Sequence, residues 1–336
     1  MMVSRSTILI TGALGCIGRA TVNWLLDNCD AGLVLFSRSL RDEDVAAAFP
    51  GDHGGRLIVE RGDVTDPARI VSLFRDHTIT HVVHLAGLQT PDCNAHRDLG
   101  LQVNLAGTQH LIEAIKSLPD PRTVLAFVYA SSVAVYGPRD NYAEDKITPE
   151  SLVDPVNVYG IWKYASELIA KLFHADTGIP TICIRPATLF GPGRDLGQTA
   201  APTTAMKSVA IGVPYTIPFD SRLDYQYAPD VGAAFGMCAL QPPPGFHVFN
   251  LPSVTLAMSE VVDSMRRGAT EVGVLDRFHV AIGEESVPFI YDLGFQSFLD
   301  LFPNIQQTPL DDAVRESIEV FIHQAERGVL RAGDLS

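Results

Sequence analysis

A tyrosine and a lysine four residues apart form the first pair of side chains in this sequence that could do chemistry. Tyr159 and Lys163 stand in the run Tyr-Gly-Ile-Trp-Lys, and if this run begins a helix they lie on one face, one turn apart. A phenol ordinarily loses its proton at about pH 10. Because a neighbouring ammonium stabilises the phenolate and lowers its pKa, the pair could transfer a proton at neutral pH.

Two serines stand upstream, at the end of an apolar run. Ser131 and Ser132 follow Tyr129 and Ala130. Ser132 could hydrogen-bond the reacting oxygen beside the tyrosine and polarise it. Strand-end serines also form turns or cap helices, and a Tyr-x-x-x-Lys spacing is frequent by chance. A catalytic interpretation therefore depends on what else the chain carries.

A glycine-rich turn near the N-terminus supplies that context. Gly12, Gly15 and Gly18 follow the apolar run 8–11 and open a segment with apolar residues at helical spacing. Such a turn lets the backbone approach a pyrophosphate without Cβ clashes, and the N-terminus of the following helix offers free N–H groups and a positive dipole. Strand, glycine turn and helix in this order predict a dinucleotide site.

Apolar runs and helical patterns alternate through the first half of the chain. The strand-like runs are 8–11, 33–37, 57–61, 81–86, 124–130 and 181–185. This alternation predicts an α/β fold, a doubly wound parallel (Rossmann) sheet with ligands at the carboxyl ends of its strands. Prolines interrupt the rhythm from about residue 190. We expect a dinucleotide-binding domain over residues 1–188 and a smaller, discontinuous α/β substrate lobe over residues 189–336.

Composition and charge narrow the class of partner. The chain has 25 basic and 39 acidic residues, a formal net charge of −14 and no prominent Lys/Arg cluster, so we expect no nucleic acid or membrane partner. Five scattered cysteines without a C-x-x-C pair favour neither a metal site nor a disulfide framework. With a first strand too close to the N-terminus to leave room for a signal peptide, this predicts a cytoplasmic protein.

Taken together, the motifs resemble the extended branch of the short-chain dehydrogenase/reductase superfamily, the NAD-dependent epimerase/dehydratase-like family. The resemblance covers essentially the whole chain. The matching motifs are Gly-Ala-Leu-Gly-Cys-Ile-Gly at 12–18, Gly-Asp-Val at 62–64, His-Leu-Ala-Gly at 84–87, Val-Asn-Leu-Ala-Gly-Thr at 103–108, Ser131-Ser132 before Val-Tyr-Gly, Tyr159 with Lys163, and Arg185-Pro186 before Gly-Pro-Gly.

This resemblance implies catalytic roles for three residues. Tyr159 would be the acid/base, Lys163 would bind the nicotinamide ribose and tune the tyrosine, and Ser132 would assist. It also implies a cofactor site. Asp63 would contact the adenine, and Pro186 would lie by the nicotinamide. The other residues expected around the cofactor are Gly12, Gly15, Cys16, Ile17, Gly18, Val64, Leu85, Ala86, Gly87, Asn104 and Thr188. The family usually dimerises through two helices per subunit, so we expect a homodimer.

The tip of the second strand bears on the choice of cofactor. An acidic residue there would bind the ribose hydroxyls and repel a 2′-phosphate, whereas this chain has Ser37 and Arg38. A hydroxyl and a guanidinium suit a phosphate, because charge-assisted hydrogen bonds are the stronger ones. We therefore expect a preference for NADP, with NAD possible if Arg38 is only a solvated surface residue.

Three further residues bear on the substrate. The guanidinium of Arg222 could form a bidentate hydrogen bond with a carboxylate or phosphate. The stretch around it is similar to the one where threonine-dehydrogenase-like members bind the substrate's carboxylate. Arg222 could instead pair with Asp220 or Asp224. Gln89 follows the fourth strand-like run and could donate to a substrate oxygen. Thr188 stands where sugar-nucleotide members commonly have Asn.

The expected function is an NAD(P)-dependent oxidoreductase that interconverts a secondary alcohol and a ketone on a small, anionic hydroxy or oxo acid. A nucleotide-sugar epimerase with recycled NAD is the first alternative. Dehydration is the poorer variant of it, because no acidic residue stands near Ser132. The second alternative is a non-catalytic protein that binds NADP as a sensor.

Overall fold

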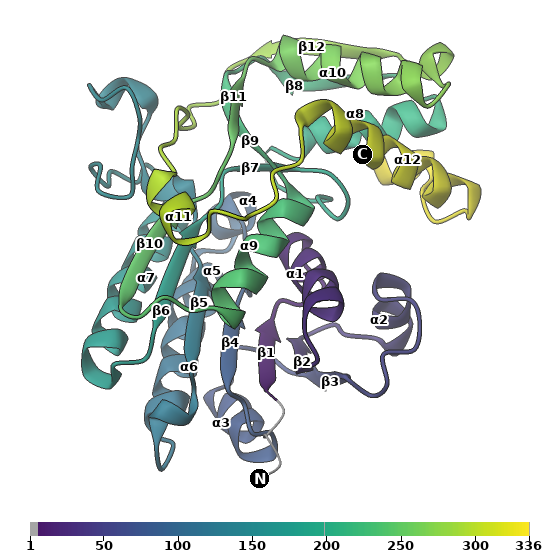
Figure 1. The fold of residues 1–336 in the computed structure, drawn as a ribbon. Helices are drawn as coiled ribbons and strands as arrows, with labels where there is room; N and C mark the ends of the chain where they lie inside the picture. The colour runs from purple at the N-terminus through teal and green to yellow at the C-terminus, as the bar shows by residue number, and fades with distance from the viewer. Residues whose placement is uncertain (1–5, 198, 336) are drawn as a thin grey trace.

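The computed structural model describes residues 6–197 and 199–335, and a parallel sheet forms its centre (Figure 1). Within the described residues this sheet has seven strands in the order β10-β6-β5-β4-β1-β2-β3, with every neighbouring pair parallel. The strands are β1 (Thr7–Thr11), β2 (Gly32–Ser37), β3 (Leu57–Arg61), β4 (His81–His84), β5 (Ala126–Ala130), β6 (Thr181–Arg185) and β10 (Phe246–Asn250). The predicted doubly wound fold is confirmed. Its strand order reverses between β1 and β4, where such sheets bind ligands.

Helices cover both faces of this sheet. On one face lie α1 (Cys16–Asn28), α2 (Asp42–Ala48), α9 (Ala228–Leu240) and α11 (Gln296–Leu301). On the other lie α3 (Pro67–Asp76), α6 (Gly107–Lys116) and α7 (Val158–Thr177). Two short helices, α4 (Thr90–Ala95) and α5 (Arg97–Leu101), lead into a π-helical turn, η1 (Gln102–Ala106). Because both faces are buried at the centre of the sheet, β1, β2, β5 and β6 consist mainly of buried apolar residues.

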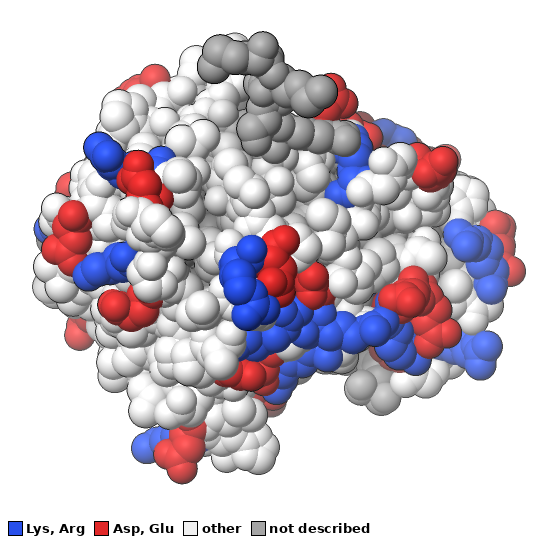
Figure 2. All heavy atoms as spheres, turned by 90° about the horizontal axis from the view of Figure 1, so that it is seen from below, with Lys and Arg blue, Asp and Glu red and all other residues white. Residues whose placement is uncertain are grey.

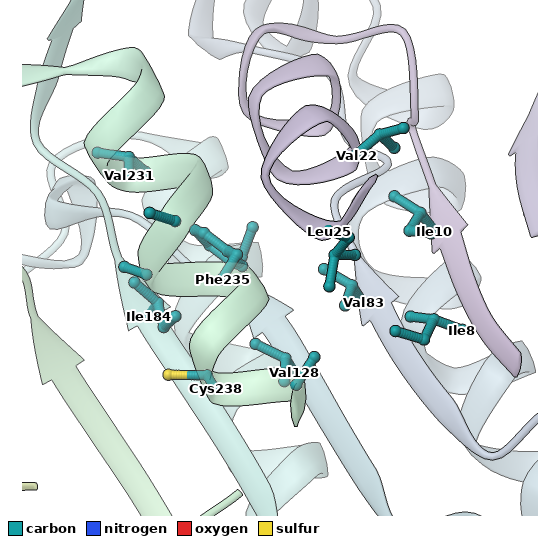
Figure 3. Packing of buried hydrophobic residues seen from close by; sticks show 14 of the residues in the cluster. Ile8, Ile10, Val22, Leu25, Val83, Val128, Ile184, Val231, Phe235 and Cys238 are labelled. Atoms are coloured by element: carbon teal, nitrogen blue, oxygen red, sulfur yellow. The ribbon is translucent and has the colours of Figure 1, made fainter. Parts of the chain in front are cut away.

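Helix α9 and strand β10 come from the second half of the chain yet belong to this first core. Figure 3 shows Val231 and Phe235 of α9 against the same face of the sheet as Leu25 of α1. The two helices pack so closely that a Cβ at Gly232 would clash with the Cβ of Ala20. The domain boundary expected at residue 188 stays a prediction, but segments on either side of it share one core.

A second, smaller core lies in the remaining part of the chain. Its elements are β7 (Thr188–Phe190), α8 (Ala201–Ile211), β8 (Tyr215–Phe219), β9 (Leu223–Tyr227), β11 (Val254–Leu256), α10 (Met258–Glu271), β12 (Val280–Glu285) and α12 (Leu310–Glu326). The strands form the sheets β11-β9-β7 and β12-β8. Apolar residues of α8, α10 and α12 pack together against them. Figure 1 shows this lobe above the carboxyl ends of the main strands.

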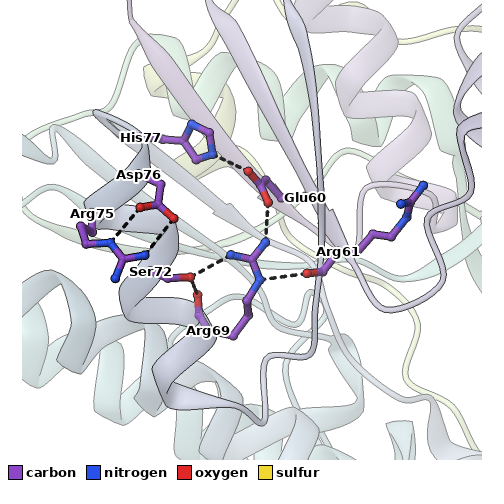
Figure 4. Close-up of polar contacts among 7 residues, drawn as sticks. All are labelled: Glu60, Arg61, Arg69, Ser72, Arg75, Asp76 and His77. Atoms are coloured by element: carbon purple, nitrogen blue, oxygen red, sulfur yellow. Dashed lines mark hydrogen bonds and ion pairs between the residues drawn. The ribbon is translucent and has the colours of Figure 1, made fainter.

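A polar network fixes the edge of the main sheet next to the expected adenine site. Figure 4 shows the Arg69 guanidinium of α3 between Glu60 and the backbone of β3. Its Nε donates to the carbonyl of Arg61 at 2.9 Å, and His77 Nε2 lies 2.7 Å from Glu60 Oε1. These contacts tie α3 to β3 and so hold the intervening turn that carries Asp63.

The charged surface is mixed on the face seen from below. Figure 2 shows Lys and Arg side chains lying directly beside Asp and Glu there, and exposed pairs such as Arg41 with Glu43 and Arg75 with Asp76 are in contact. Among the helices of the described residues, none has the length and apolar character needed to span a bilayer.

Candidate active site

A cleft with a volume of about 240 Å³ lies at the carboxyl ends of the central strands, under the smaller lobe. Its lining includes the glycine-rich turn, residues at and after the ends of β4, β5 and β6, and helix α7. The expected site residues among them are Gly12, Gly15, Cys16, Ile17, Gly18, Leu85, Gly87, Gln89, Ser132, Tyr159, Lys163, Pro186 and Thr188. Residues separated by more than half of the chain, from Gly12 to Thr188, therefore meet in one cavity.

Helix α7 positions the tyrosine and the lysine. The helix begins after Asn157, whose Oδ1 accepts a hydrogen bond from the backbone N–H of Gly160 at 2.9 Å. Lys163 is buried, its Nζ donates to the carbonyl of Ala130 at 2.7 Å, and it lies 5.6 Å from the centre of the Tyr159 ring. The pair thus has the arrangement that its spacing predicts.

Burial dominates the titration of both groups. Desolvation lowers the pKa of Lys163 to about 8, and it raises the pKa of Tyr159 even though the hydrogen bond with Ser132 and the charge of Arg194 act to lower it. The expected net lowering of the tyrosine pKa is therefore not what the described side chains produce. With these neighbours Tyr159 holds its proton at neutral pH, which suits a proton donor to a ketone.

Ser132 combines the two roles that its position suggests. Its Oγ accepts a hydrogen bond from Ala134 N–H at 3.1 Å, capping the short turn η3 (Val133–Val135), and it also lines the cleft. Ser131 also lines the cleft, and its Oγ donates to Glu167 at 2.5 Å. Glu167 in turn pairs with Arg185 at 2.6 Å, with both side chains buried. A buried ionic network thus supports the floor of the site.

The glycine-rich turn fits the phosphates of a dinucleotide. Gly12 has φ of +70°, and a Cβ there would lie 2.9 Å from the backbone nitrogen of Ala86, so only glycine lets the turn lie against the end of β4. Helix α1 then begins at Cys16 with its N-terminus at the cleft. Backbone without side chains and free N–H groups at a helix start are what a diphosphate requires.

The residues expected at the adenine end gather separately from the catalytic pair. Arg38 Nε lies 3.7 Å from Asp63 Oδ2, and Asp63 Oδ1 accepts a hydrogen bond from Thr65 N–H at 2.9 Å. Ser37 ends strand β2. Val64 is buried, and a Cβ at Gly107 would come within 2.7 Å of it, so Val64 packs against the start of α6. None of these residues is among those that line the cleft.

Three other expected site residues also lie outside the cleft lining. Ala86 N–H donates to Thr11 Oγ1. Asn104 is buried, and its side chain accepts from the N–H of Leu88 at 2.7 Å and donates to the carbonyl of Leu88 at 3.0 Å; it therefore holds the loop that carries Gln89. Arg222 precedes β9 and does not line the cleft.

The structure also brings residues to the cleft that the sequence did not single out. Arg194 and Thr199 reach it from the loop after β7, and Phe289 and Ile290 reach it from the segment between β12 and α11. The Gly-Pro-Gly turn at 191–193, directly before an arginine and after a strand, was a usable signal for Arg194. The segment with Phe289 and Ile290 carries no pattern that points to a site.

The fold and this cleft define a class of protein: a Rossmann-type dinucleotide-binding fold with the Tyr-x-x-x-Lys pair of the short-chain dehydrogenases/reductases. The chain belongs to the NAD-dependent epimerase/dehydratase family, whose model matches residues 8–251.

Individual relatives carry several activities. The chain is 31% identical over 186 residues to the UDP-glucose 4-epimerase of Mus musculus, a match covering 53% of this chain and 52% of the relative. It is 31% identical over 190 residues to the D-erythronate dehydrogenase of Cupriavidus necator, covering 53% and 56%. The chain thus matches about half the length of these curated relatives.

Solved structures agree on the fold over almost the whole chain. The UDP-glucose 4-epimerase of Thermus thermophilus in complex with NAD superposes with a TM-score of 0.78 at 20% identity, covering 94% of this chain and 98% of that one. At this identity the likeness shows the fold alone.

Proposed function

We propose that this chain is an oxidoreductase that uses NADP in preference to NAD and interconverts a secondary alcohol and a ketone on a small anionic substrate. The observation that carries the proposal is the meeting of Ser132, Tyr159 and Lys163 with the glycine-rich turn in a single cleft. A sensor that only binds the cofactor would not need an acid/base tyrosine there.

The chain's own residues can hold the cofactor and handle the proton. Gly12, Gly15 and the start of α1 would take the diphosphate, and Arg38 would take a 2′-phosphate. When bound, the cofactor supplies or accepts a hydride at the nicotinamide C4. Tyr159 then gives its phenolic proton to the substrate oxygen in reduction and takes it back in oxidation. Ser132 donates to the same oxygen and orients it.

Lys163 has a positioning and an electrostatic part in this scheme. The bond from its Nζ to the Ala130 carbonyl holds the ammonium beside the Tyr159 ring. A positive charge at that place favours the phenolate over the phenol, so it eases the departure of the proton.

The comparisons support two substrate classes. The similarity to a D-erythronate dehydrogenase supports a hydroxy acid, and the similarity to UDP-glucose 4-epimerases supports a sugar nucleotide with recycled NAD. The exposed guanidinium of Arg38 at the tip of β2 favours a phosphorylated cofactor and hence the first class. We further propose a homodimer through α5 and α7, whose exposed apolar residues Leu99, Leu101, Ile161, Leu168 and Leu172 would be covered by a second copy.

One experiment separates the two classes. One sample of the purified protein is denatured, and any nucleotide that it releases is identified. A second, native sample from which bound nucleotide has been removed is assayed with D-erythronate plus NADP⁺ or NAD⁺ and, in parallel, with UDP-glucose. We expect that the protein releases no nucleotide on denaturation and that it reduces NADP⁺ to NADPH as it oxidises the hydroxy acid. Tightly held NAD, with conversion of UDP-glucose to UDP-galactose and no net reduction of cofactor, would replace the proposal by the epimerase.

A further inference from the structure

The loop after β7 places an arginine over the cleft. It leaves the strand through Gly191 and Gly193, both with positive φ, and a Cβ at Gly193 would lie 3.7 Å from the Cα of Cys16. The loop therefore crosses directly above the glycine-rich turn. This path carries the side chain of Arg194 into the cavity.

Among the described residues, the hydrogen-bond partners of Arg194 are all neutral. Its Nη1 donates to Gln89 Oε1 at 3.4 Å, a long contact, and its Nη2 donates to Thr199 Oγ1 at 3.2 Å. Its Nε is buried and has no hydrogen-bond partner in the part of the chain that the structure describes. Within the same part of the chain no carboxylate forms an ion pair with this guanidinium.

Neighbouring charged groups show that this state is particular to Arg194. Asp195, the next residue, is paired with Lys207 at 2.5 Å; its charge acts on Arg194, but the two form no ion pair and the effect of burial on the pKa of Arg194 is larger. Arg185, which is more deeply buried than Arg194, has Glu167 and the Tyr136 hydroxyl as partners. A partly buried cation without a paired carboxylate is unfavourable, and desolvation lowers the pKa of Arg194. Such an arrangement persists where a ligand supplies the missing charge.

We propose that Arg194 is the anion anchor of the substrate, binding its carboxylate or phosphate while Gln89 and Thr199 hold the guanidinium in place. This assignment rests on the proposed function for the identity of the substrate. Arg194 lines the same cleft as Cys16 and Tyr159, so the guanidinium shares one cavity with the phosphate turn and the proton donor. Arg222, the arginine that the sequence favours for this role, does not line the cleft.

The diphosphate of the cofactor is a second source of the same oxyanion chemistry. We assign the substrate for two reasons. The turn and the start of α1 already offer N–H groups for the diphosphate, and one of the two partners of Arg194 is Gln89, on the loop after β4. The apolar side chains of Phe289 and Ile290 line the same cleft and suit the carbon skeleton of a small substrate.

The test measures binding rather than turnover. Wild type, Arg194→Met, Arg194→Lys and the control Arg222→Met are saturated with NADPH and titrated calorimetrically with D-erythronate, its neutral counterpart erythritol, and UDP-glucose. NADPH and NADH affinities are measured by fluorescence, which also reports that each variant is folded. Wild type should bind one of the two anions and not erythritol. Arg194→Met should weaken binding of that anion by roughly 30-fold or more, and Arg194→Lys should recover part of the lost affinity. Arg222→Met should bind the anion as tightly as wild type does. The affinity for NADPH should be the same in all four proteins.

The outcomes separate this assignment from the proposed function. If UDP-glucose binds in place of D-erythronate with the same dependence on Arg194, the anchor stands and the hydroxy-acid function fails. If Arg194→Met lowers the affinity for NADPH but not the affinity for the anion, the ligand of Arg194 is the cofactor's diphosphate and the assignment is overturned. Equal binding of the anion by wild type and Arg194→Met, or no binding of either anion by wild type, would also overturn it.

Discussion

The Lys163 ammonium lies 5.6 Å from the centre of the Tyr159 ring, one helical turn further along α7. It is held there from the other side by the carbonyl of Ala130, the last residue of β5. The separation of the two groups is therefore set jointly by a helix and a strand end. Rigid elements of this kind hold catalytic groups more accurately than loops do.

The phenol of Tyr159 is expected to be needed for turnover but not for cofactor binding. Tyr159→Phe removes the proton donor and leaves the ring, so kcat should fall by roughly 10²- to 10⁴-fold while NADPH affinity is retained. Tyr164→Phe, a change on the same helix in the small cluster around Val135, is the matched control. Steady-state rates and fluorescence titrations check both, and a Tyr159→Phe enzyme with full activity would refute the assignment.

The charge of Lys163 should make stability depend on pH. Burial lowers its pKa from the ordinary 10.5 to about 8. Between these values the unfolded chain holds a proton that the folded protein has released, so wild-type stability rises with pH across this window. Lys163→Met lacks this contribution. The free energy of unfolding of the variant relative to wild type should therefore be highest below pH 8 and fall by up to about 3 kcal/mol by pH 10.5.

Urea unfolding at pH 7 and at pH 10 measures this difference. Lys116→Met serves as the control, since Lys116 sits at the surface, paired with Asp176, where burial is slight. If the difference in unfolding free energy between Lys163→Met and wild type is the same at both pH values, the pKa of Lys163 is not lowered in the folded protein.

Arg38 is expected to select the cofactor. Its side chain is 55% exposed and only loosely paired with Asp63, so it is available for a 2′-phosphate. Arg38→Ala should weaken NADPH binding by about tenfold, a moderate value for a solvent-exposed charge, and should leave the affinity for NADH unchanged. The nearby Arg41→Ala, which removes a surface arginine paired with Glu43 and Asp44, should alter neither affinity. An unchanged ratio of NADPH to NADH affinity in Arg38→Ala would remove the argument for NADP.

The buried pair of Glu167 and Arg185 should matter far more for stability than a surface pair. Glu167→Gln leaves the Arg185 guanidinium buried without its counter-charge, and the expected loss is about 3 kcal/mol or more. Asp176→Asn, which breaks the exposed pair with Lys116, should cost less than about 1 kcal/mol. Denaturant midpoints measured under identical conditions compare the two, and similar losses would contradict the proposed support of the cleft floor.

The order of the elements and the chemistry at the strand ends follow from short stretches of sequence. Apolar runs of strand length between helical patterns require a parallel sheet buried on both faces. The glycine turn is readable because a positive φ and a close backbone approach at Gly12 leave no other residue type free of strain. The pairing of Tyr159 with Lys163 is readable because four residues make one helical turn.

Other features depend on which distant segments meet, and no local pattern reveals them. Helix α9 and strand β10 join the first core although a long proline-rich stretch separates them from β6, because α9 can pack closely on α1 at Gly232. Nothing in the sequence around Arg194 and Arg222 shows which of the two reaches the cleft. The path of the chain after β7 brings Arg194 there. The pKa values of Tyr159 and Lys163 likewise depend on burial, which is a property of the assembled core and not of the residues that flank them.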